Sequence, residues 1–219
     1  MPRLSLLHTA RSNIEIFETV RRRMRLDGVT LRHRVRADLL AAAEAPGAAL
    51  APVLQRAAGE LDILAAGADA VLLTCSTLGP AAALARQTAG VPVLRVDQAL
   101  ADEAVREGGR VVVLCAAGTT IAPTRALFEH AALLTGAEIE VRLVPGAWER
   151  FRAGDDAGYL ALVAEAADLA GREGPVSVAL AQASMAGAAA LCHEAAPLTS
   201  PAVGLAAAVA AARGTARRP

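Results

Sequence analysis

The stretch that decides the fold reads VLLTCSTLGPAAAL over residues 71–84 and returns as VALAQASMAGAAAL over residues 178–191. The two copies align without gaps at one constant offset, which sets Cys75 opposite Gln182. The same offset aligns RLSLLHTARSN, which begins at Arg3, with RVVVLCAAGTT, which begins at Arg110. Because one spacing satisfies two separate pairs of segments, the sequence predicts two similar halves that enclose a cleft with a reactive thiol on one wall.

The composition narrows the class of protein. The chain has 219 residues, enough to bury one sizeable core or two smaller ones. Basic and acidic residues balance at 22 each, which argues against a nucleic-acid footprint or a basic membrane patch. All the basic residues are arginine, so neither a Schiff base to pyridoxal phosphate nor a Walker-type phosphate loop can form. We therefore expect no cofactor, no nucleic-acid partner and no membrane partner.

The cysteines and the chain start indicate a compartment. The three cysteines have no paired spacing and form no metal-ligand cluster with the four histidines, so we expect no metal and a reduced, cytoplasmic chain. The first thirteen residues lack the long apolar run of a signal peptide. The Ala-rich segment 202–212 is too short and too weakly hydrophobic to span a bilayer.

Short aliphatic runs alternate with longer segments rich in Ala, Leu, Arg and Glu. This alternation indicates βαβ units and parallel sheets, and nearly continuous apolar runs such as VVVL are typical of strands covered on both faces. The expected strands are Leu4–His8, Val29–Val35, Ala70–Thr74, Val93–Val96, Arg110–Cys115, Glu138–Val144 and Val176–Ala181. The expected helices are Ile14–Arg25, Ala48–Ala65, Leu78–Ala89, Gln98–Glu107, Thr124–Leu134, Tyr159–Ala170, Met185–Glu194 and Pro201–Arg213.

The predicted fold is α/β, with two pseudo-symmetric flavodoxin-like lobes, each a parallel sheet flanked by helices, and an interlobe cleft. The repeat divides the chain near Asp97. The first lobe is expected to comprise residues 1–97 together with 205–219, because the last helix would cross back onto the first half; the second lobe would comprise residues 98–204. The weakly periodic segment Pro145–Gly158 is expected to be a loop over the cleft.

Small polar residues gather where the predicted strands end. In open α/β sheets, ligands bind outside the carboxyl ends of the strands, where hydroxyls and unpaired N–H groups suit a carboxylate. We therefore predict that the residues binding a small carboxylate substrate are Thr9, Thr74, Ser76, Thr77, Thr119, Thr120, Gln182 and Ser184. The pairs Ser76-Thr77 and Thr119-Thr120 are expected to occupy almost the same place in the two halves, either as carboxylate cradles or as simple helix N-caps.

Cys75 is the predicted catalytic thiol. It follows a strand and precedes a helix expected to start near Thr77, whose unpaired N–H groups and positive dipole end would stabilise the thiolate. Such a thiolate can act as a base toward a C–H proton or as a nucleophile. The alternative is a buried, inert cysteine, which is the role expected of Cys115 and Cys192.

His8 is the second predicted catalytic residue. In a flavodoxin-like strand order the first and third strands are neighbours, which would set His8 beside Cys75. Its imidazole could hold the thiolate as an ion pair or relay a proton, or it could be a hydrogen-bonded histidine that does not titrate. The other three, His33, His130 and His193, are expected on the surface or on helix faces.

The segments GADAVLLTCSTLGP, VPVLRVDQALADEAV, TTIAPTRALFEHAA and LAQASMAG resemble those of the cofactor-independent aspartate/glutamate/hydantoin racemase superfamily, and they are spread over nearly the whole chain. The resemblance implies two α/β lobes with the substrate between them. Two cysteines on opposite walls would remove and return the proton at an acidic carbon next to a carboxylate. By resemblance, Cys75 takes the first cysteine position, and the residues that match substrate-carboxylate positions are Ser76, Thr77, Thr119 and Thr120.

The chain departs from that pattern at the second cysteine position, which holds Gln182. An amide cannot serve as an acid or base near neutral pH, and Ser184 is a poor proton carrier without an activating base. Racemisation by two thiols is therefore excluded. The resemblance extends to superfamily members with one cysteine that are similar to arylmalonate decarboxylase, and to relatives similar to maleate isomerase, which use a cysteine as nucleophile on an alkene diacid.

The function predicted from these residues is an isomerase of this superfamily that acts at the acidic carbon of a small carboxylate, an amino acid or a relative, with Cys75 as its thiol acid/base. One alternative is a single-cysteine decarboxylase or a cis–trans isomerase of a small dicarboxylate. Another, from a different class, is a non-catalytic small-acid binding protein. The sequence does not identify the substrate, any second base or the oligomeric state. A homo-oligomer is among the states that it leaves open.

Overall fold

The computed structural model describes residues 1–174 and 176–215, and these divide into two compact units. Of these residues, unit 1 comprises Met1–Ala99 and 201–215, and unit 2 comprises the described residues of Leu100–Ser200. Residues 216–219 of the predicted segment 205–219 lie outside the described residues.

Unit 1 is built on a four-stranded parallel sheet with the strand order β2-β1-β3-β4. The strands are β1 (Arg3–His8), β2 (Thr30–Val35), β3 (Ala70–Leu73) and β4 (Val93–Arg95). The helices with residues in this unit are α1 (Ser12–Arg23), α2 (Ala37–Glu44), α3 (Leu50–Ala65), α4 (Ala81–Ala85), α5 (Val96–Val105, which ends in unit 2) and α9 (Ser200–Thr215).

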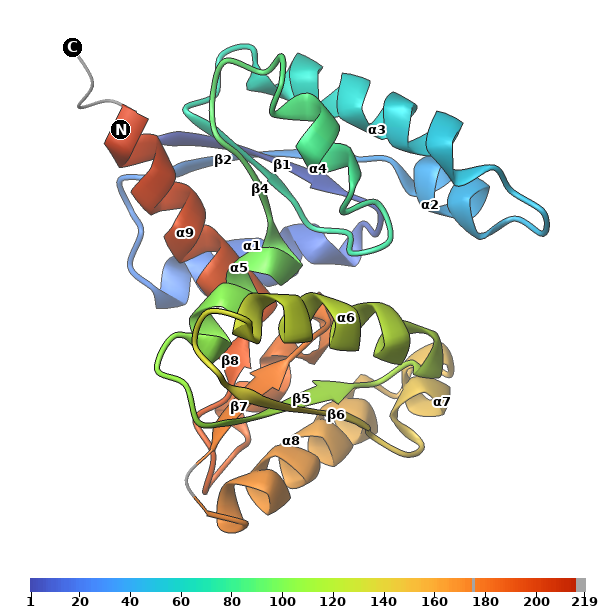
Figure 1. Cartoon of the computed structure of the whole chain (residues 1–219), viewed down its shortest axis with the longest axis vertical. Helices are drawn as coiled ribbons and strands as arrows, with labels where there is room; N and C mark the ends of the chain where they lie inside the picture. Colours follow the sequence, from blue (N-terminus) through green and yellow to red (C-terminus); the bar gives the residue numbers. More distant parts are fainter. Residues whose placement is uncertain (175, 216–219) are drawn as a thin grey trace. The chain divides into compact units, whose positions relative to one another are not determined.

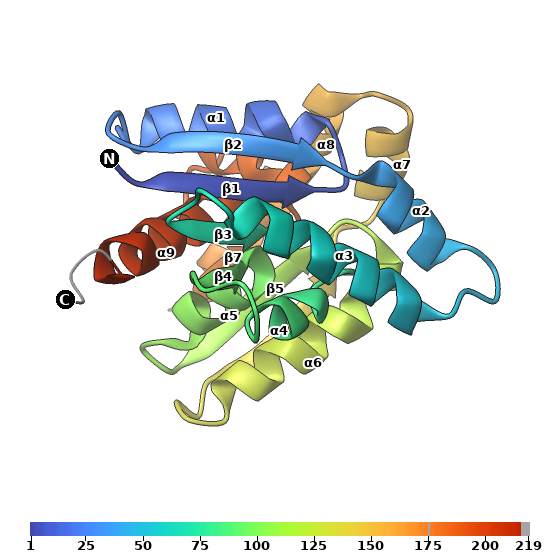
Figure 2. The same ribbon diagram turned by 90° about the horizontal axis from the view of Figure 1, so that it is seen from above.

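Helices cover both faces of the first sheet (Figure 1). On one face, α2, α3 and α4 pack on a buried cluster that includes Leu7 and Leu73. On the other face, Phe17 of α1 contacts the ring of His8, and Gly204 lets α9 approach Leu72. Figure 2 shows β1 and β2 side by side as arrows that point the same way. Burial on both faces is the physical reason for the continuous apolar runs in β1 and β3.

Unit 2 repeats the topology with the strand order β6-β5-β7-β8, again parallel throughout. Its strands are β5 (Arg110–Cys115), β6 (Glu138–Leu143), β7 (Ser177–Leu180) and β8 (Leu198–Thr199). Its helices include α6 (Ile121–Ala132), α7 (Ala147–Arg152), α8 (Asp156–Arg172) and the 3₁₀ helices η1 (Gly118–Thr120) and η2 (Ala183–Ala190). The buried cluster on one face joins Leu114 and Leu180 to Tyr159 and Val163 of α8.

The two units confirm the predicted α/β fold with two similar parallel sheets. The bounds of strands β1 and β5 are related by the same offset as the repeated motif, and so are those of β3 and β7. The predicted neighbouring of the first and third strands is also confirmed, because Leu7 is the register partner of Leu73. None of the helices in the described part of the chain combines the length and hydropathy that a membrane span requires.

Several predicted elements differ in the structure. The expected helix Met185–Glu194 is the 3₁₀ helix η2, where Gly187 lies so close to α8 that an added Cβ would be 2.9 Å from Leu160 Cδ1. The expected loop Pro145–Gly158 contains α7 and the start of α8. That helix starts there because the Asp155 carboxylate accepts the Gly158 N–H at 2.9 Å and caps it. Helix α2 and strand β8 were not predicted.

Candidate functional site

The predicted catalytic thiol lies at the carboxyl edge of the first sheet. Its neighbour Thr74 donates its backbone N–H to the Leu7 carbonyl at 3.0 Å, so Thr74 and Cys75 leave β3 beside the end of β1. Cys75 is 8% exposed and belongs to the apolar cluster that includes Leu73 and Leu78. The sulfur therefore lies at the border between the core of unit 1 and the polar loop that follows β3.

The turn after Cys75 differs from the prediction. A helix was expected to start near Thr77, but residues 76–80 form hydrogen-bonded turns, with Gly79 N–H donating to the Ser76 carbonyl at 3.0 Å, and the five-residue helix α4 begins after Pro80. Proline has no N–H to donate and commonly begins a helix, which explains the late start. The prediction that a helix starts near Thr77, directly beside Cys75, was therefore wrong.

Unpaired backbone groups remain beside the thiol in place of a helix end. The N–H groups of Ser76 and Thr77 have no acceptor among the residues that the structure describes, and both residues are exposed. The same holds for the N–H groups of Thr9 and Ala10 after β1, which find no acceptor in the described part of the chain. These donors can satisfy an anion in the way that the predicted carboxylate cradle requires.

Gly79 of the motif has a packing role in the same turn. An added Cβ would lie 2.5 Å from the guanidinium of Arg95, which Asp97 holds by two hydrogen bonds of 3.0 and 2.7 Å. Because a side chain at position 79 would displace this ion pair, the glycine lets Arg95 lie across the turn. The residue thus shapes the loop that follows the thiol.

His8 is buried, and both of its ring nitrogens have partners within unit 1. Its Nδ1 lies 2.8 Å from Thr74 Oγ1, and its Nε2 lies 2.9 Å from His33 Nδ1. Burial, and then the charge of His33, lower the pKa of His8 to about 3. The imidazole is therefore neutral near pH 7. The geometry supports the alternative of a hydrogen-bonded histidine over a cation that pairs with a thiolate.

His33 was expected on the surface, and that prediction was wrong. Its side chain is 12% exposed and bonds both His8 and, at 3.3 Å, the Glu18 carboxylate. The signal was present in the period-two pattern of TLRHRV, which sets His33 on the same face as Leu31 and Val35. Asn13, which the sequence reasoning also missed, is buried in the first turn of α1 and only 9% exposed.

The matching edge of the second sheet carries the other predicted residues. The Gln182 side-chain Oε1 accepts the backbone N–H groups of Ala116 at 2.6 Å and of Ala117 at 3.3 Å. Ser184 Oγ lies 2.8 Å from the hydroxyl of Tyr159, and burial raises the pKa of Tyr159 to about 12. In unit 2, therefore, a protein side chain accepts hydrogen bonds from the two N–H groups whose counterparts in unit 1, those of Thr9 and Ala10, have no acceptor among the described residues.

The two hydroxyl pairs, Ser76-Thr77 and Thr119-Thr120, do not occupy equivalent places, contrary to the prediction. Thr119-Thr120 follow β5, the counterpart of β1, whereas Ser76-Thr77 follow β3, the counterpart of β7. Thr119 is exposed, and Thr120 Oγ1 donates to the Ala117 carbonyl at 2.7 Å. One sheet edge thus brings together His8, Thr9, Thr74, Cys75, Ser76 and Thr77, and the edge of the other sheet brings together Thr119, Thr120, Gln182 and Ser184.

The other two cysteines lie away from open donors. Cys115 is fully buried, and burial raises its pKa although the Thr120 and Thr124 hydroxyls oppose the change. Cys192 Sγ lies 3.3 Å from the Ala188 carbonyl, and burial followed by the charge of Asp168 raises its pKa. Residues 1–174 and 176–215 contain no group of three or more His, Cys, Asp or Glu side chains able to hold a metal ion.

Two repeated parallel-sheet units, with a cysteine at the carboxyl edge of one and a glutamine at the same place in the other, define a class of two-unit α/β proteins. The chain belongs to the Asp/Glu/hydantoin racemase family, whose family model matches residues 11–212. This confirms the resemblance inferred from the sequence segments. No curated protein matches the chain by sequence.

Solved structures of racemases share the fold at low sequence identity. An aspartate racemase homologue from Pyrococcus horikoshii OT3 is 14% identical, with a TM-score of 0.72 over 97% of this chain and 100% of that chain. The aspartate racemase of Picrophilus torridus is 11% identical, with a TM-score of 0.69 over 97% and 95%. The allantoin racemase of Pseudomonas fluorescens is 18% identical, with a TM-score of 0.67 over 97% and 92%.

Proposed function

We propose that this chain is a cofactor-independent enzyme that acts at the acidic carbon of a small carboxylate, with Cys75 as its thiol acid/base. The observation that carries the proposal is the contrast between two equivalent sheet edges. In unit 2 an amide oxygen of Gln182 fills the N–H pair of Ala116 and Ala117. In unit 1 the equivalent N–H groups belong to Thr9 and Ala10. They have no acceptor among the described residues, so they can bind a substrate carboxylate oxygen.

The chemistry of the proposed step balances with one thiol. The Cys75 thiolate takes the proton from the acidic carbon, and the electron pair of the C–H bond passes into the adjoining carboxylate as an enediolate. The thiol then returns the proton to the carbon. The open N–H groups of Thr9, Ser76 and Thr77 would stabilise the negative charge that develops on the carboxylate oxygens.

The repeat offers a single thiol at its two equivalent positions, Cys75 and Gln182, which favours a reaction with one acid/base group. The Gln182 amide is hydrogen-bonded to two backbone N–H groups and carries no transferable proton near neutral pH. We therefore propose decarboxylation of a small dicarboxylate as the second candidate: the C–C bond electrons remain as the enediolate, carbon dioxide leaves, and the Cys75 thiol donates its proton. A cis–trans isomerase would instead add the Cys75 sulfur to an alkene and release it after rotation.

The test is a substrate screen of the whole chain in D₂O with amino acids, hydantoins, malonates and maleate. Optical rotation, carbon dioxide release and deuterium incorporation separate racemisation, decarboxylation and one-face exchange. Cys75→Ser is expected to abolish whichever activity appears, while Cys115→Ser and Cys192→Ser retain it. Turnover that survives Cys75→Ser would contradict the proposal.

A non-catalytic small-acid binding protein makes the opposite prediction. It would bind a carboxylate with unchanged affinity after Cys75→Ser, and no compound of the screen would turn over.

We propose a cytoplasmic location for the enzyme, because the unpaired thiols Cys75, Cys115 and Cys192 fit a reducing compartment.

A further inference from the structure

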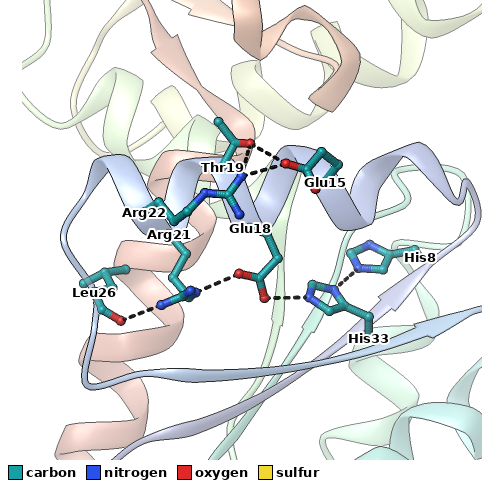
Figure 3. Close-up of polar contacts among 8 residues, drawn as sticks. All are labelled: His8, Glu15, Glu18, Thr19, Arg21, Arg22, Leu26 and His33. Atoms are coloured by element: carbon teal, nitrogen blue, oxygen red, sulfur yellow. Dashed lines mark hydrogen bonds and ion pairs between the residues drawn. The ribbon is translucent and has the colours of Figure 1, made fainter.

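A chain of hydrogen bonds runs from helix α1 through the first sheet to the residue before Cys75. Glu18 Oε1 lies 3.3 Å from His33 Nε2, and His33 Nδ1 lies 2.9 Å from His8 Nε2 (Figure 3). The far ring nitrogen of His8 lies 2.8 Å from Thr74 Oγ1. Burial increases along the chain, from 25% side-chain exposure at Glu18 and 12% at His33 to a fully buried His8.

The order of the protons in this chain follows from counting donors. The hydroxyl of Thr74 has one proton, and it donates that proton to the Leu7 carbonyl at 3.0 Å. Thr74 Oγ1 must then accept from His8 Nδ1–H. Since His8 is neutral, its Nε2 is an acceptor, and the hydrogen bond to His33 requires a proton on His33 Nδ1.

The last link places a second proton on His33. A carboxylate only accepts hydrogen bonds, so the contact with Glu18 requires a proton on His33 Nε2 as well. All four bonds are satisfied together when His33 is an imidazolium paired with Glu18. The buried ring of His8 cannot take that charge, because burial and the charge of His33 lower its pKa to about 3.

The groups that face His33 favour this arrangement. Helix α1 contributes Glu18, and Arg21 Nε donates to the other oxygen of that carboxylate at 2.8 Å. Burial opposes ionisation of Glu18, but hydrogen bonds from Arg21 and His33 lower its pKa overall. Strand β1 contributes the neutral His8, and alternation along β2 sets Arg32 and Arg34 on the opposite face of the sheet.

We propose that Glu18, His33 and His8 form a positioning chain that fixes the direction of the Thr74 hydroxyl at the residue before Cys75. In its relation to Cys75 the inference rests on the proposed function, whereas the order of protons does not. A His33 ring with a single proton that still donates to Glu18 would carry that proton on Nε2, so His8 would have to donate from Nε2 and Thr74 would have to turn its proton from the Leu7 carbonyl to His8 Nδ1. The charge of Glu18 is thereby coupled to the direction of the Thr74 hydroxyl, at the edge of the sheet where the thiol lies.

The proton order can be read from the ¹⁵N shifts of the imidazole rings in the labelled whole chain, which has four histidines. We expect at pH 7 that His33 carries protons on both ring nitrogens and that His8 carries its proton on Nδ1. Substitutions His33→Gln and His8→Gln assign the signals. A neutral His33, or a His8 ring with its proton on Nε2, overturns the proposal.

Charge-matched variants on one helix test the cause. Glu18→Gln removes the carboxylate that faces His33, and we expect the ring pattern of His33 to become that of a neutral imidazole at pH 7. Glu15→Gln is the control, because Glu15 on the same helix bonds Arg22 and Thr19 (Figure 3). A pattern that is the same in both variants overturns the role of Glu18.

The link to the thiol is tested by the alkylation rate of Cys75 at pH 7. Because the Thr74 hydroxyl changes its acceptor, we expect the rate in Glu18→Gln to differ from that in Glu15→Gln by about fivefold, the factor carried by one net hydrogen bond. Thr74→Val should show a similar change and Thr74→Ser should not. Equal rates overturn the positioning role; an inactive Cys75 would refute the proposed function and leave the ring shifts as an independent result.

Discussion

The side-chain oxygen of Gln182 lies 2.6 Å from the backbone nitrogen of Ala116 and accepts its N–H. In the other unit, the equivalent N–H beside Cys75 finds no acceptor among the described residues. The repeat pairs Gln182 with Cys75 and, at the same offset, Ala116 with Thr9. One copy of the repeated motif therefore uses its side chain to satisfy its own loop. The other copy keeps those donors available and carries a thiol.

The first prediction concerns the stability that Gln182 provides. Gln182→Leu removes the acceptor of two backbone N–H groups without replacing it, so we expect the free energy of unfolding to fall by about 1–3 kcal/mol. Urea denaturation of the variant measures the change. Gln87→Leu, at an exposed position, is the control.

Activity gives the complementary readout for the same residue. Because its amide moves no proton in the proposed step, chemistry at Cys75 should persist in Gln182→Leu under conditions where the variant is folded. A folded Gln182→Leu protein that has lost all turnover would show that the amide takes part in the reaction.

The second prediction is the order in which the thiols react. Burial raises the pKa of Cys115 and of Cys192, so both should alkylate slowly with iodoacetamide at pH 7. Their rates should increase only when the pH rises above the pKa of a free thiol. Cys75, at the polar edge of its sheet, is expected to react first and to be protected by substrate. Mass spectrometry of the peptides gives the three rates. Equal, slow labelling of all three would favour a binding protein over an enzyme.

The repeat made the fold predictable, because sheet-forming segments of one length recur at one spacing. Strands β1 and β5, and likewise β3 and β7, follow the offset of the repeated motif, so the position of Cys75 at a strand end could be read from the sequence. Helix lengths were less predictable where small residues dominate. The Ala-rich segments after Cys75 and Gln182 become a short helix and a 3₁₀ helix, because packing of glycines against Arg95 and Leu160 decides their geometry.

The candidate site was predictable only in part, for a related reason. Polar residues at strand ends identify the edge where ligands bind, but the partners of each side chain come from distant segments. Nothing local to Gln182 shows that its oxygen bonds the loop after β5. The pairing of His8 with His33 also depends on two strands that are separate in the sequence becoming neighbours in the sheet.

The third prediction follows from the neutral, buried ring of His8. Its pKa is lowered from 6.5 to about 3 in the folded chain, so below pH 6.5 the unfolded chain binds a proton that the folded chain does not. Stability should therefore fall as the pH drops from 6.5 toward 3, by about 1.4 kcal/mol per pH unit for this group. His8→Gln removes the group and should flatten the profile of unfolding free energy against pH in that window. The same slope in His8→Gln as in the parent would contradict the prediction, and His130→Gln, at an exposed position, is the control.

The fourth prediction concerns a carboxylate that holds the loop after η2. Asp168 of α8 accepts the backbone N–H groups of His193, Glu194 and Ala195 at distances between 2.8 and 3.0 Å. Hydrogen bonds, first from Ala195 and then from His193, lower the pKa of Asp168 from 3.8 to about 2. Its contribution to stability is therefore present above pH 3.8 and lost as the pH falls through 2.

Replacing this carboxylate separates charge from packing. Asp168→Asn keeps the volume but turns N–H groups toward backbone donors, so we expect a lower Tm at pH 7 and a smaller loss of Tm between pH 4 and pH 2 than in the parent chain. Asp156→Asn, an exposed position in the first turn of the same helix, makes the same charge change and is the matched control. Differential scanning calorimetry at the two pH values measures both. If the two variants have the same Tm at pH 7, the hydrogen bonds from the three backbone N–H groups do not hold the loop. The close approach of Gly171 to Ala195 would then be the contact that joins α8 to the loop after η2.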